Sequence, residues 1–292
     1  KPMDNAQGHL NILDLSFVDI RRKVKEEGAD LILIPIGSCE KHGPHLPLGV
    51  DSYITIAVVE RAARLSNVLH TPLMPFGYSP HHMGEPDQGT GTVTLSAATY
   101  RAVLYDIARS LIYHGFNKRI YVSHHGSNTK PIDEVTRRLR YETGAFIAWY
   151  KTPTERELNV LADILEGPPE ETPGWHSGEL ETSTTLALRP DTVVMDRAKE
   201  DRAHAPRWLG PAFSKKDGTG TVIFQGSENI WIPMEHHEYS DIAVIGNPFR
   251  ASAEKGHRII ERMAEHLSAF VEEIKRIEVR VSSEKRDFPA RA

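Results

Sequence analysis

Residues 31–51 read LILIPIGSCEKHGPHLPLGVD, an apolar run followed without a gap by a polar loop that contains prolines. The run from Leu31 to Ile36 is short and rich in branched aliphatic side chains, and it ends at Gly37, which is the pattern of a buried β-strand. The loop that follows it holds the ionisable residues Glu40, His42, His45 and Asp51. Because ligands bind at the carboxyl ends of strands in open α/β sheets, this loop is the first candidate for a functional site.

Apolar periodicity along the rest of the chain predicts strands that alternate with helices. Further strands are expected at 68–74, 119–122, 145–150 and 242–245. Helices are expected at 16–27, 51–65, 96–114, 132–143, 154–165 and 253–277, and another helix is expected to follow the motif at 175–183 and to end at 188. Residues 76–91 are predicted to form a long loop, and residues 190–225 are polar and irregular, with a flexible tip at 215–220. Alternation at a spacing of about thirty residues predicts an α/β fold with a mainly parallel sheet and helices on both faces. No repeat or linker divides the chain, so we expect a single domain.

Composition excludes several classes of protein. The 292 residues are 39% hydrophobic and 26% charged with a net charge of −5, which is typical of a globular protein and argues against a nucleic-acid partner. No apolar stretch approaches the ~18 residues of a membrane span, and the N-terminus lacks a signal-peptide pattern. The single cysteine, Cys39, excludes an internal disulfide. These features favour a cytoplasmic protein that does not bind membranes.

Histidines are numerous, and several of them fall in three polar clusters after predicted strands or at the start of a helix. The chain has 15 histidines. The clusters are Glu40, His42, His45 and Asp51; then His124, His125, Ser127 and Asn128; and then His176, Glu179 and Glu181. Mixed histidine and carboxylate ligands suit Zn²⁺, Mn²⁺ or Fe²⁺, and two such ions bridged by a carboxylate form a common hydrolytic site.

Each of these residues also has an ordinary structural interpretation. Asp51 can cap the following helix and Glu181 can favour a helix dipole, while His45 can brace the proline-containing loop. The loop positions of His81, His82, His236 and His237 favour surface or structural roles. His124 and His125 are adjacent and point opposite ways in an extended segment, so one of them is expected to be a ligand. Cys39 is either a nucleophile assisted by His42 or, as its strand-end position favours, an inert thiol.

The order of these motifs resembles the creatininase (creatinine amidohydrolase) family. Glu40-x-His42-Gly-Pro-His-Leu-Pro-Leu followed by Asp51 is similar to the signature of that family. The segments 125–128 (HGSN) and 176–183 (HSGELETS) resemble its His-Gly-Gly-Asn turn and its His-Ala-Gly-x-x-Glu-Thr-Ser block. Residues 246–248 (GNP) and 253–256 (AEKG) resemble its C-terminal motifs. The match runs from about residue 15 to 275, and we expect the ends, 1–14 and 281–292, to be flexible.

The resemblance implies a three-layer α/β/α sandwich that assembles as a homo-oligomer, a hexamer in that family, and binds two divalent metal ions. Zn²⁺ and Mn²⁺ are the expected ions, with Fe²⁺ as an alternative. By the same resemblance, Glu40, His42, Asp51 and His125 fall on metal-ligand positions, with Asp51 as the bridge, and Glu181 completes the shell of the second ion. His176 falls on the position for proton transfer, and we expect Glu179 to assist it.

Two departures from creatininase itself point to a different substrate. Ser127 stands where creatininase has a glutamate ligand, and the loop at 78–92 is longer than in the family pattern. We expect the substrate to contact His81, His82, His124, Ser127, Asn128 and Trp175.

The predicted activity is attack of metal-bound hydroxide on a carbonyl of a small cyclic substrate. The bond that breaks is C–N in a cyclic amide or C–C in a cyclic diketone, the latter as in hydrolysis of 3-dehydro-scyllo-inosose. Alternatives within the family are an amidohydrolase or deformylase and a peptide-trimming enzyme. Alternatives of other classes are a catalytically silent metal-binding scaffold and an amidase that uses Cys39.

Overall fold

A parallel sheet lies at the centre of the molecule. The computed structural model describes residues 8–155, 158–167, 176–215 and 217–281. The sheet contains β1 (Leu31–Pro35), β2 (Leu69–His70), β3 (Lys118–Ser123) and β4 (Phe146–Lys151) in the order β2-β1-β3-β4, and every pairing is parallel. All four carboxyl ends therefore open toward one edge, as the alternating sequence pattern predicts.

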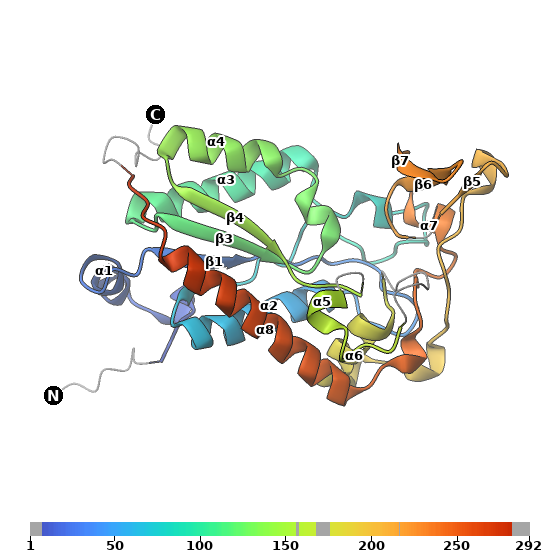
Figure 1. Cartoon of the computed structure of the whole chain (residues 1–292), viewed down its shortest axis with the longest axis horizontal. Helices are drawn as coiled ribbons and strands as arrows, with labels where there is room; N and C mark the ends of the chain where they lie inside the picture. The colour runs from blue at the N-terminus through green and yellow to red at the C-terminus, as the bar shows by residue number, and fades with distance from the viewer. Residues whose placement is uncertain (1–7, 156–157, 168–175, 216, 282–292) are drawn as a thin grey trace.

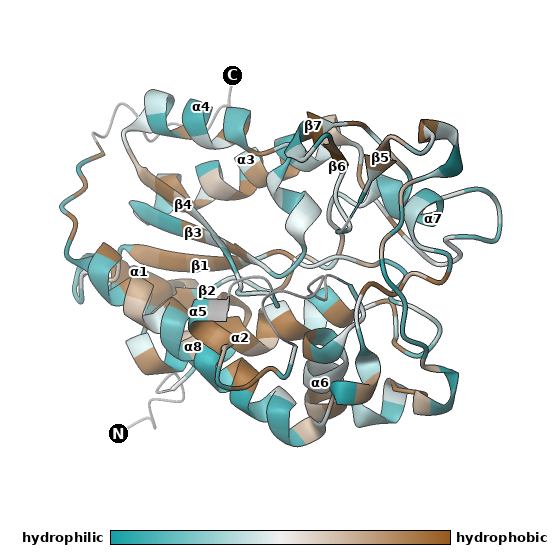
Figure 2. Cartoon of the chain, turned by 45° about the vertical axis from the view of Figure 1, so that its right-hand side comes forward, coloured by the Kyte–Doolittle hydropathy of each residue, from teal (hydrophilic) through white to brown (hydrophobic). Residues whose placement is uncertain are grey.

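Helices cover both faces of this sheet (Figure 1). One face packs against α2 (Val50–Ser66) and α8 (Ala253–Lys275), and the other packs against α3 (Ala97–His114) and α4 (Asp133–Thr143). The remaining helices are α1 (Phe17–Lys25), α5 (Leu158–Leu161), α6 (Glu179–Leu188) and α7 (His236–Tyr239). Figure 2 shows the apolar strands in the interior and hydrophilic residues on the outer faces of the helices. The predicted α/β class and mainly parallel sheet are confirmed.

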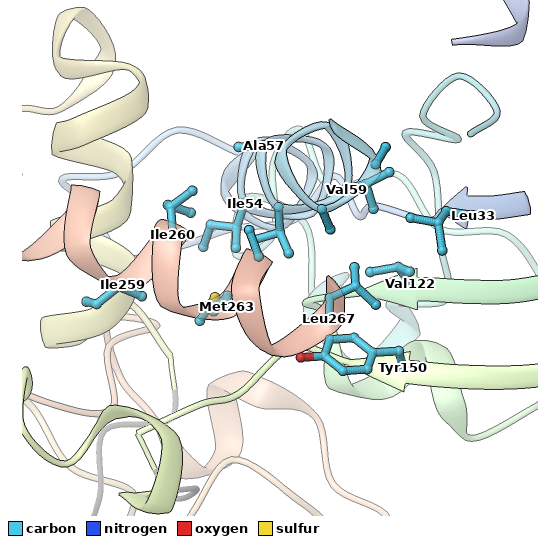
Figure 3. Packing of buried hydrophobic residues seen from close by; sticks show 14 of the residues in the cluster. Leu33, Ile54, Ala57, Val59, Val122, Tyr150, Ile259, Ile260, Met263 and Leu267 are labelled. Carbon is cyan, nitrogen blue, oxygen red and sulfur yellow. The ribbon is translucent and has the colours of Figure 1, made fainter. Parts of the chain in front are cut away.

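Alternation of side chains along β1 explains why this strand is apolar throughout. Leu33 faces the α2–α8 layer, together with Val122 of β3 (Figure 3). Ile32 and Ile34 point the opposite way, into the cluster formed with α3 and α4. After the strand, Gly37 packs so closely on α2 that an added Cβ would lie 2.1 Å from the Ser52 hydroxyl oxygen. A side chain at position 37 would therefore push α2 away from the end of β1.

Capping residues fix the ends of several helices. Ser16 caps α1 in a capping box with Asp19, and Ser96 caps α3 by accepting a hydrogen bond from the Thr99 amide at 3.2 Å. Gly115 ends α3 with φ of 106°. By contrast, α2 has Gly49 at its N-cap, so Asp51 lies inside the first turn and does not cap the helix.

A small antiparallel sheet corrects the prediction that residues 190–225 are irregular. It consists of β5 (Phe213–Ser214), β6 (Thr221–Phe224) and β7 (Ser227–Trp231). The turn between β6 and β7 has positive φ at Gln225 (49°) and Gly226 (80°), which is the geometry of a tight hairpin. Strands this short lack enough alternating residues for the sequence pattern to reveal them.

Two other predictions about elements were wrong. Residues 242–245 do not join the central sheet, because Ile245 forms an isolated bridge with His176 instead. Within the described part of 154–165, the helix is limited to α5. The predicted flexible tip contains Lys215 and Asp217, both of which are buried. The Lys215 ammonium donates to the Thr219 carbonyl oxygen, which closes a hydrogen bond within the tip.

Short 3-10 turns complete the described chain. They are η1 (Ile12–Asp14), η2 (Pro80–His82), η3 (Gly126–Thr129), η4 (Pro190–Thr192), η5 (Met195–Arg197), η6 (Arg207–Leu209) and η7 (Pro248–Arg250). Two of them matter for the site, because η2 ends at His82 and η3 directly follows His125.

Candidate metal centre

A cavity of about 270 Å³ opens at the carboxyl edge of the central sheet, and four of the buried ionisable side chains that line it are Glu40, Asp51, His125 and Glu181. Glu40 follows β1 and His125 follows β3, whereas Asp51 and Glu181 come from the first turns of α2 and α6. Residues from four separate segments thus meet where the parallel strands end, as the position of ligand sites in open α/β sheets leads one to expect.

Asp51 occupies the middle of this group. Its Oδ2 atom is buried without a hydrogen-bond partner, 3.7 Å from His42 Nε2 and 3.6 Å from His125 Nδ1. Burial, together with the nearby Glu40 carboxylate, raises the pKa of Asp51 well above its ordinary value. A buried carboxylate oxygen that lies between two imidazole nitrogens and lacks a partner is placed to bridge two cations.

The two histidines beside Asp51 are held by backbone carbonyls. His42 Nδ1 lies 3.1 Å from the Glu40 carbonyl oxygen, and His125 Nε2 lies 3.0 Å from that of Tyr78. Because a carbonyl oxygen only accepts, each of these nitrogens carries a proton, and the other nitrogen of each ring faces Asp51. This is the arrangement that orients histidine ligands in metal sites. Burial lowers the pKa of His42 to about 4, which keeps its ring neutral and able to bind a cation.

Glu40 and His125 form a charged pair. Glu40 Oε2 accepts a hydrogen bond from the Ser38 hydroxyl at 2.8 Å and lies 3.2 Å from His125 Nδ1. Burial opposes the charge on both groups, but each stabilises the other. The pKa of Glu40 is therefore well below its ordinary value, and that of His125 is raised to about 9. Without a cation, a proton on His125 takes its place.

Glu181 closes the other side of the group. Its Oε2 atom accepts a hydrogen bond from the Ser177 amide at 2.5 Å and lies 3.6 Å from His42 Nε2. Ser177 has φ of 58°, and this strained conformation turns its N–H toward Glu181. Burial would raise the pKa of Glu181, but His42 and a hydrogen bond from His124 hold it at about 2.

Four groups of three residues in the described part of the chain could hold an ion, and two of them share Asp51. Glu40, Asp51 and His125 form the first set, and His42, Asp51 and Glu181 form the second. In each set the ligand atoms lie within 4.8 Å of one another, and all the residues are buried. The five residues that the sequence assigned to metal binding are thus brought together, with Asp51 in both sets.

The two residues expected to transfer protons lie in different surroundings. His176 lines the cavity and stacks on His42, with ring centroids 4.2 Å apart. Glu179 does not line the cavity; its carboxylate lies 2.9 Å from the Lys255 ammonium and accepts from the Glu166 amide at 3.0 Å. Residues two apart on a helix face different directions, which explains why Glu181 enters the site and Glu179 does not.

Some of the residues expected to contact the substrate line the cavity, and others do not. His81, His82, His124 and Ser127 line the cavity. Asn128 is buried outside the lining, where Oδ1 accepts from the Tyr78 amide at 2.8 Å and Nδ2 donates to the Gly37 carbonyl at 2.9 Å. It therefore fastens the loop after β1 to the turn after β3. Trp175 lies outside the described residues.

Sequence reasoning missed two residues at this site. His236 was expected to be a surface or structural residue, yet it lines the cavity from α7 and is 1% exposed. Because α7 is only four residues long, no periodicity placed it. The Glu155 carboxylate accepts from the Leu180 amide at 2.8 Å, close to His124 and Glu181, and burial raises its pKa to about 7.

Cys39 and His45 are placed outside the lining of the cavity. The Cys39 sulfur lies 3.5 Å from the Gly91 carbonyl oxygen, and burial raises the pKa of the thiol, which disfavours a nucleophilic thiolate. His45 Nε2 lies 3.0 Å from the Thr182 hydroxyl, in agreement with a bracing role for this side chain.

A parallel α/β/α sandwich with two histidine–carboxylate sets that share an aspartate defines the class of metal-dependent hydrolases. Residues 14–271 match the model of the family described as creatininase, creatinine amidohydrolase, and the chain therefore belongs to the creatininase family.

Relatives in this family catalyse different hydrolyses. The chain is 28% identical over 271 residues to a 3-dehydro-scyllo-inosose hydrolase from Thermotoga maritima, a match that covers 89% of this chain and 82% of the relative. It is 32% identical over 195 residues to creatinine amidohydrolase from Pseudomonas putida, which covers 63% of this chain and 73% of that protein.

A solved structure of creatininase has the same fold. It superposes with a TM-score of 0.72 at 23% identity and covers 93% of this chain and 100% of its own. Solved forms of creatininase include a manganese form (TM-score 0.70) and a zinc–zinc form (TM-score 0.67), each 24% identical to this chain and covering 92% of it and 99% of its own chain.

Proposed function

We propose that this chain is a hydrolase that holds two divalent metal ions and opens a small cyclic substrate at a carbonyl group. The observation that carries the proposal is the buried Asp51 Oδ2 atom, which lies without a hydrogen-bond partner between His42 and His125. Such ions, when bound, activate water and polarise the carbonyl under attack.

The residues fit a pair of ions. Glu40, Asp51 and His125 would hold the first, and His42, Asp51 and Glu181 the second. Nitrogen and carboxylate donors together suit Zn²⁺ and Mn²⁺, with Fe²⁺ as an alternative. Ser127 has no carboxylate to add to the first set. Its hydroxyl oxygen lies 3.4 Å from His81 Nε2.

His176 would move the proton. Its Nε2 atom lies 2.8 Å from the Lys41 carbonyl oxygen and so carries a hydrogen, which leaves the lone pair on Nδ1. The ring lines the cavity beside His42, so Nδ1 can accept a proton from water and return it to the leaving atom. Glu179, bound to Lys255, would act by fixing the start of α6 rather than by exchanging protons with the substrate.

A polyhydroxylated cyclic diketone is the substrate class that we favour. The relative from Thermotoga maritima hydrolyses a keto-inositol, and it matches most of this chain. The lining of the cavity also includes residues with hydroxyl or ammonium groups, among them Ser127, Thr129, Lys130 and Thr219. Such groups suit the hydroxyl and carbonyl oxygens of a sugar-like ring. In this reaction water adds to one carbonyl and the adjacent C–C bond breaks; the released carbon takes up a proton.

The experiment uses two substrate pools, one of cyclic amides and one of keto-inositols. Protein reconstituted with Zn²⁺ or Mn²⁺ is incubated with each pool, and products are identified by a mass gain of one water. We expect turnover in the keto-inositol pool. Turnover only of cyclic amides would overturn the substrate assignment, and tight metal binding without turnover in either pool would favour the silent scaffold.

We also propose that the protein forms a homo-oligomer, a hexamer as the family resemblance implies, in the cytoplasm. None of the helices in the described residues is long and apolar enough to span a membrane. Sedimentation of the metal-loaded protein measures the assembly directly, and a monomer at micromolar concentration would contradict it.

A further inference from the structure

Three histidine rings gather beside the proposed two-ion site. His82 comes from η2, His176 precedes α6, and His236 opens α7. The ring centroid of His82 lies 4.9 Å from that of His176 and 4.4 Å from that of His236. The ring centroids of His176 and His236 lie 4.9 Å apart. One nitrogen of each lies within 4.8 Å of the others, and all three residues are buried.

The hydrogen bonding of these rings leaves nitrogen lone pairs without a partner. His176 donates from Nε2 to the Lys41 carbonyl, so its lone pair is on Nδ1. His82 Nε2 lies 3.3 Å from Glu40 Oε1, while His82 Nδ1 is buried without a hydrogen-bond partner. His236 Nδ1 is likewise buried without one. Buried polar atoms are rarely left unpaired, so two in one cluster call for a ligand.

The chemistry of the cluster suits a cation. Imidazole nitrogens are common ligands of divalent cations, and the three rings are buried with one nitrogen of each close to the others. A backbone carbonyl orients His176 and a carboxylate orients His82, and these are the usual outer partners of histidine ligands. Three imidazoles favour Zn²⁺ or a similar borderline ion over Mg²⁺ or Ca²⁺.

We propose that His82, His176 and His236 form a third divalent-cation site, and that its occupation inhibits the enzyme. The site has no carboxylate ligand, so it binds Zn²⁺ more weakly than the two sets that share Asp51. A cation there takes the Nδ1 lone pair of His176, and that nitrogen can then no longer accept a proton. The inhibitory part rests on the proposed function, whereas the binding part does not.

A metal count tests the site without any substrate. Metal-free protein is titrated with Zn²⁺ against a chromophoric chelator, and Co²⁺ absorption reports the ligand geometry of each equivalent. We expect three equivalents in the unmodified protein, two tight and one weaker, and loss of the weaker one in His236→Gln. His204→Gln is the matched control, because the side chain of His204 is 48% exposed and lies outside the cluster. Only two equivalents in the unmodified protein, or a third that survives in His236→Gln, would overturn the site.

Two further variants keep the outcomes distinct. His82→Gln removes the same equivalent from a different element, so that misfolding of α7 cannot imitate the result. Asp51→Asn should lower the number of tight equivalents and leave the weaker one, which separates failure of the third site from failure of the two-ion site.

The inhibition is measured on the substrate found in the pools. Excess Zn²⁺ should inhibit the unmodified enzyme. The Zn²⁺ concentration that half-inhibits His236→Gln should be at least about tenfold higher than for the unmodified enzyme. Equal sensitivity of the two proteins would overturn the link to His176.

Discussion

Replacing Asp51 with asparagine should separate metal binding from folding. The substitution keeps the shape of the side chain and removes the charge of the oxygen that lies between His42 and His125. Metal ions lower the pKa of the water that they bind from 15.7 to about 7, so a disrupted pair loses most of its nucleophile at neutral pH. We expect the hydrolytic rate to fall by about 10³-fold or more.

The stability of the metal-free variant should change in the opposite direction. The pKa of Asp51 is raised in the folded protein, so its carboxylate destabilises the fold at a pH above its ordinary value. Asparagine removes that cost, and a gain of about 1 kcal/mol would raise Tm by about 2–4 °C. With metal at 100 times its Kd, binding adds about 2.7 kcal/mol to the unmodified protein and little to the variant.

Calorimetry with and without Zn²⁺ measures both effects. The variant should melt at or above the unmodified protein when metal is absent, and below it when metal is present. Its metal content, measured by atomic emission, should fall below two ions per chain. An equal rise in Tm on adding metal, or an unchanged metal content, would refute the bridging position of Asp51.

Three other variants or conditions test neighbouring parts of the account. Glu179→Gln breaks the ion pair between Glu179 and Lys255 and should lower the free energy of unfolding, measured by denaturant titration, by about 1–3 kcal/mol. Metal content and kcat should be retained. A large fall in kcat at full metal content would indicate that Glu179 transfers protons. Cys39→Ser should retain activity, and removal of metal by a chelator should abolish activity. An inactive Cys39→Ser variant together with insensitivity to chelators would favour a cysteine nucleophile. Since the pKa of His125 is raised from 6.5 to about 9, the metal-free protein should lose stability as the pH rises from 6.5 to about 9. Metal uptake below about pH 9 should release a proton from His125, which titration calorimetry in two buffers measures. Metal uptake without proton release would contradict this protonation of His125.

Apolar periodicity sustained over whole elements predicted the central sheet and its helices. The apolar run at Leu31–Ile36 and the periodic stretch at 96–114 predicted elements close to those observed, because burial and helical spacing are local properties. Short elements were missed. Neither the hairpin at 221–231 nor the bridge of Ile245 to His176 has enough residues to set a period.

The site shows the same division. Residues that directly follow strands, such as Glu40 and His125, could be placed at one edge of the sheet from topology alone. The direction of Glu179 depends on its angular position in α6, and the arrival of His236 depends on tertiary packing of a four-residue helix. The spacing of Glu179 and Glu181 shows that they face different directions, but which of them enters the site is fixed by tertiary packing, as is the position of His236.

Product analysis of the metal-loaded and metal-stripped protein is the decisive measurement for the two-ion site. The account predicts that the loaded protein adds one water to a member of the keto-inositol pool, that chelation abolishes this reaction, and that Zn²⁺ or Mn²⁺ restores it in the unmodified protein but not in Asp51→Asn. Hydrolysis that persists at full rate after metal removal, or in Asp51→Asn, would contradict the two-ion site.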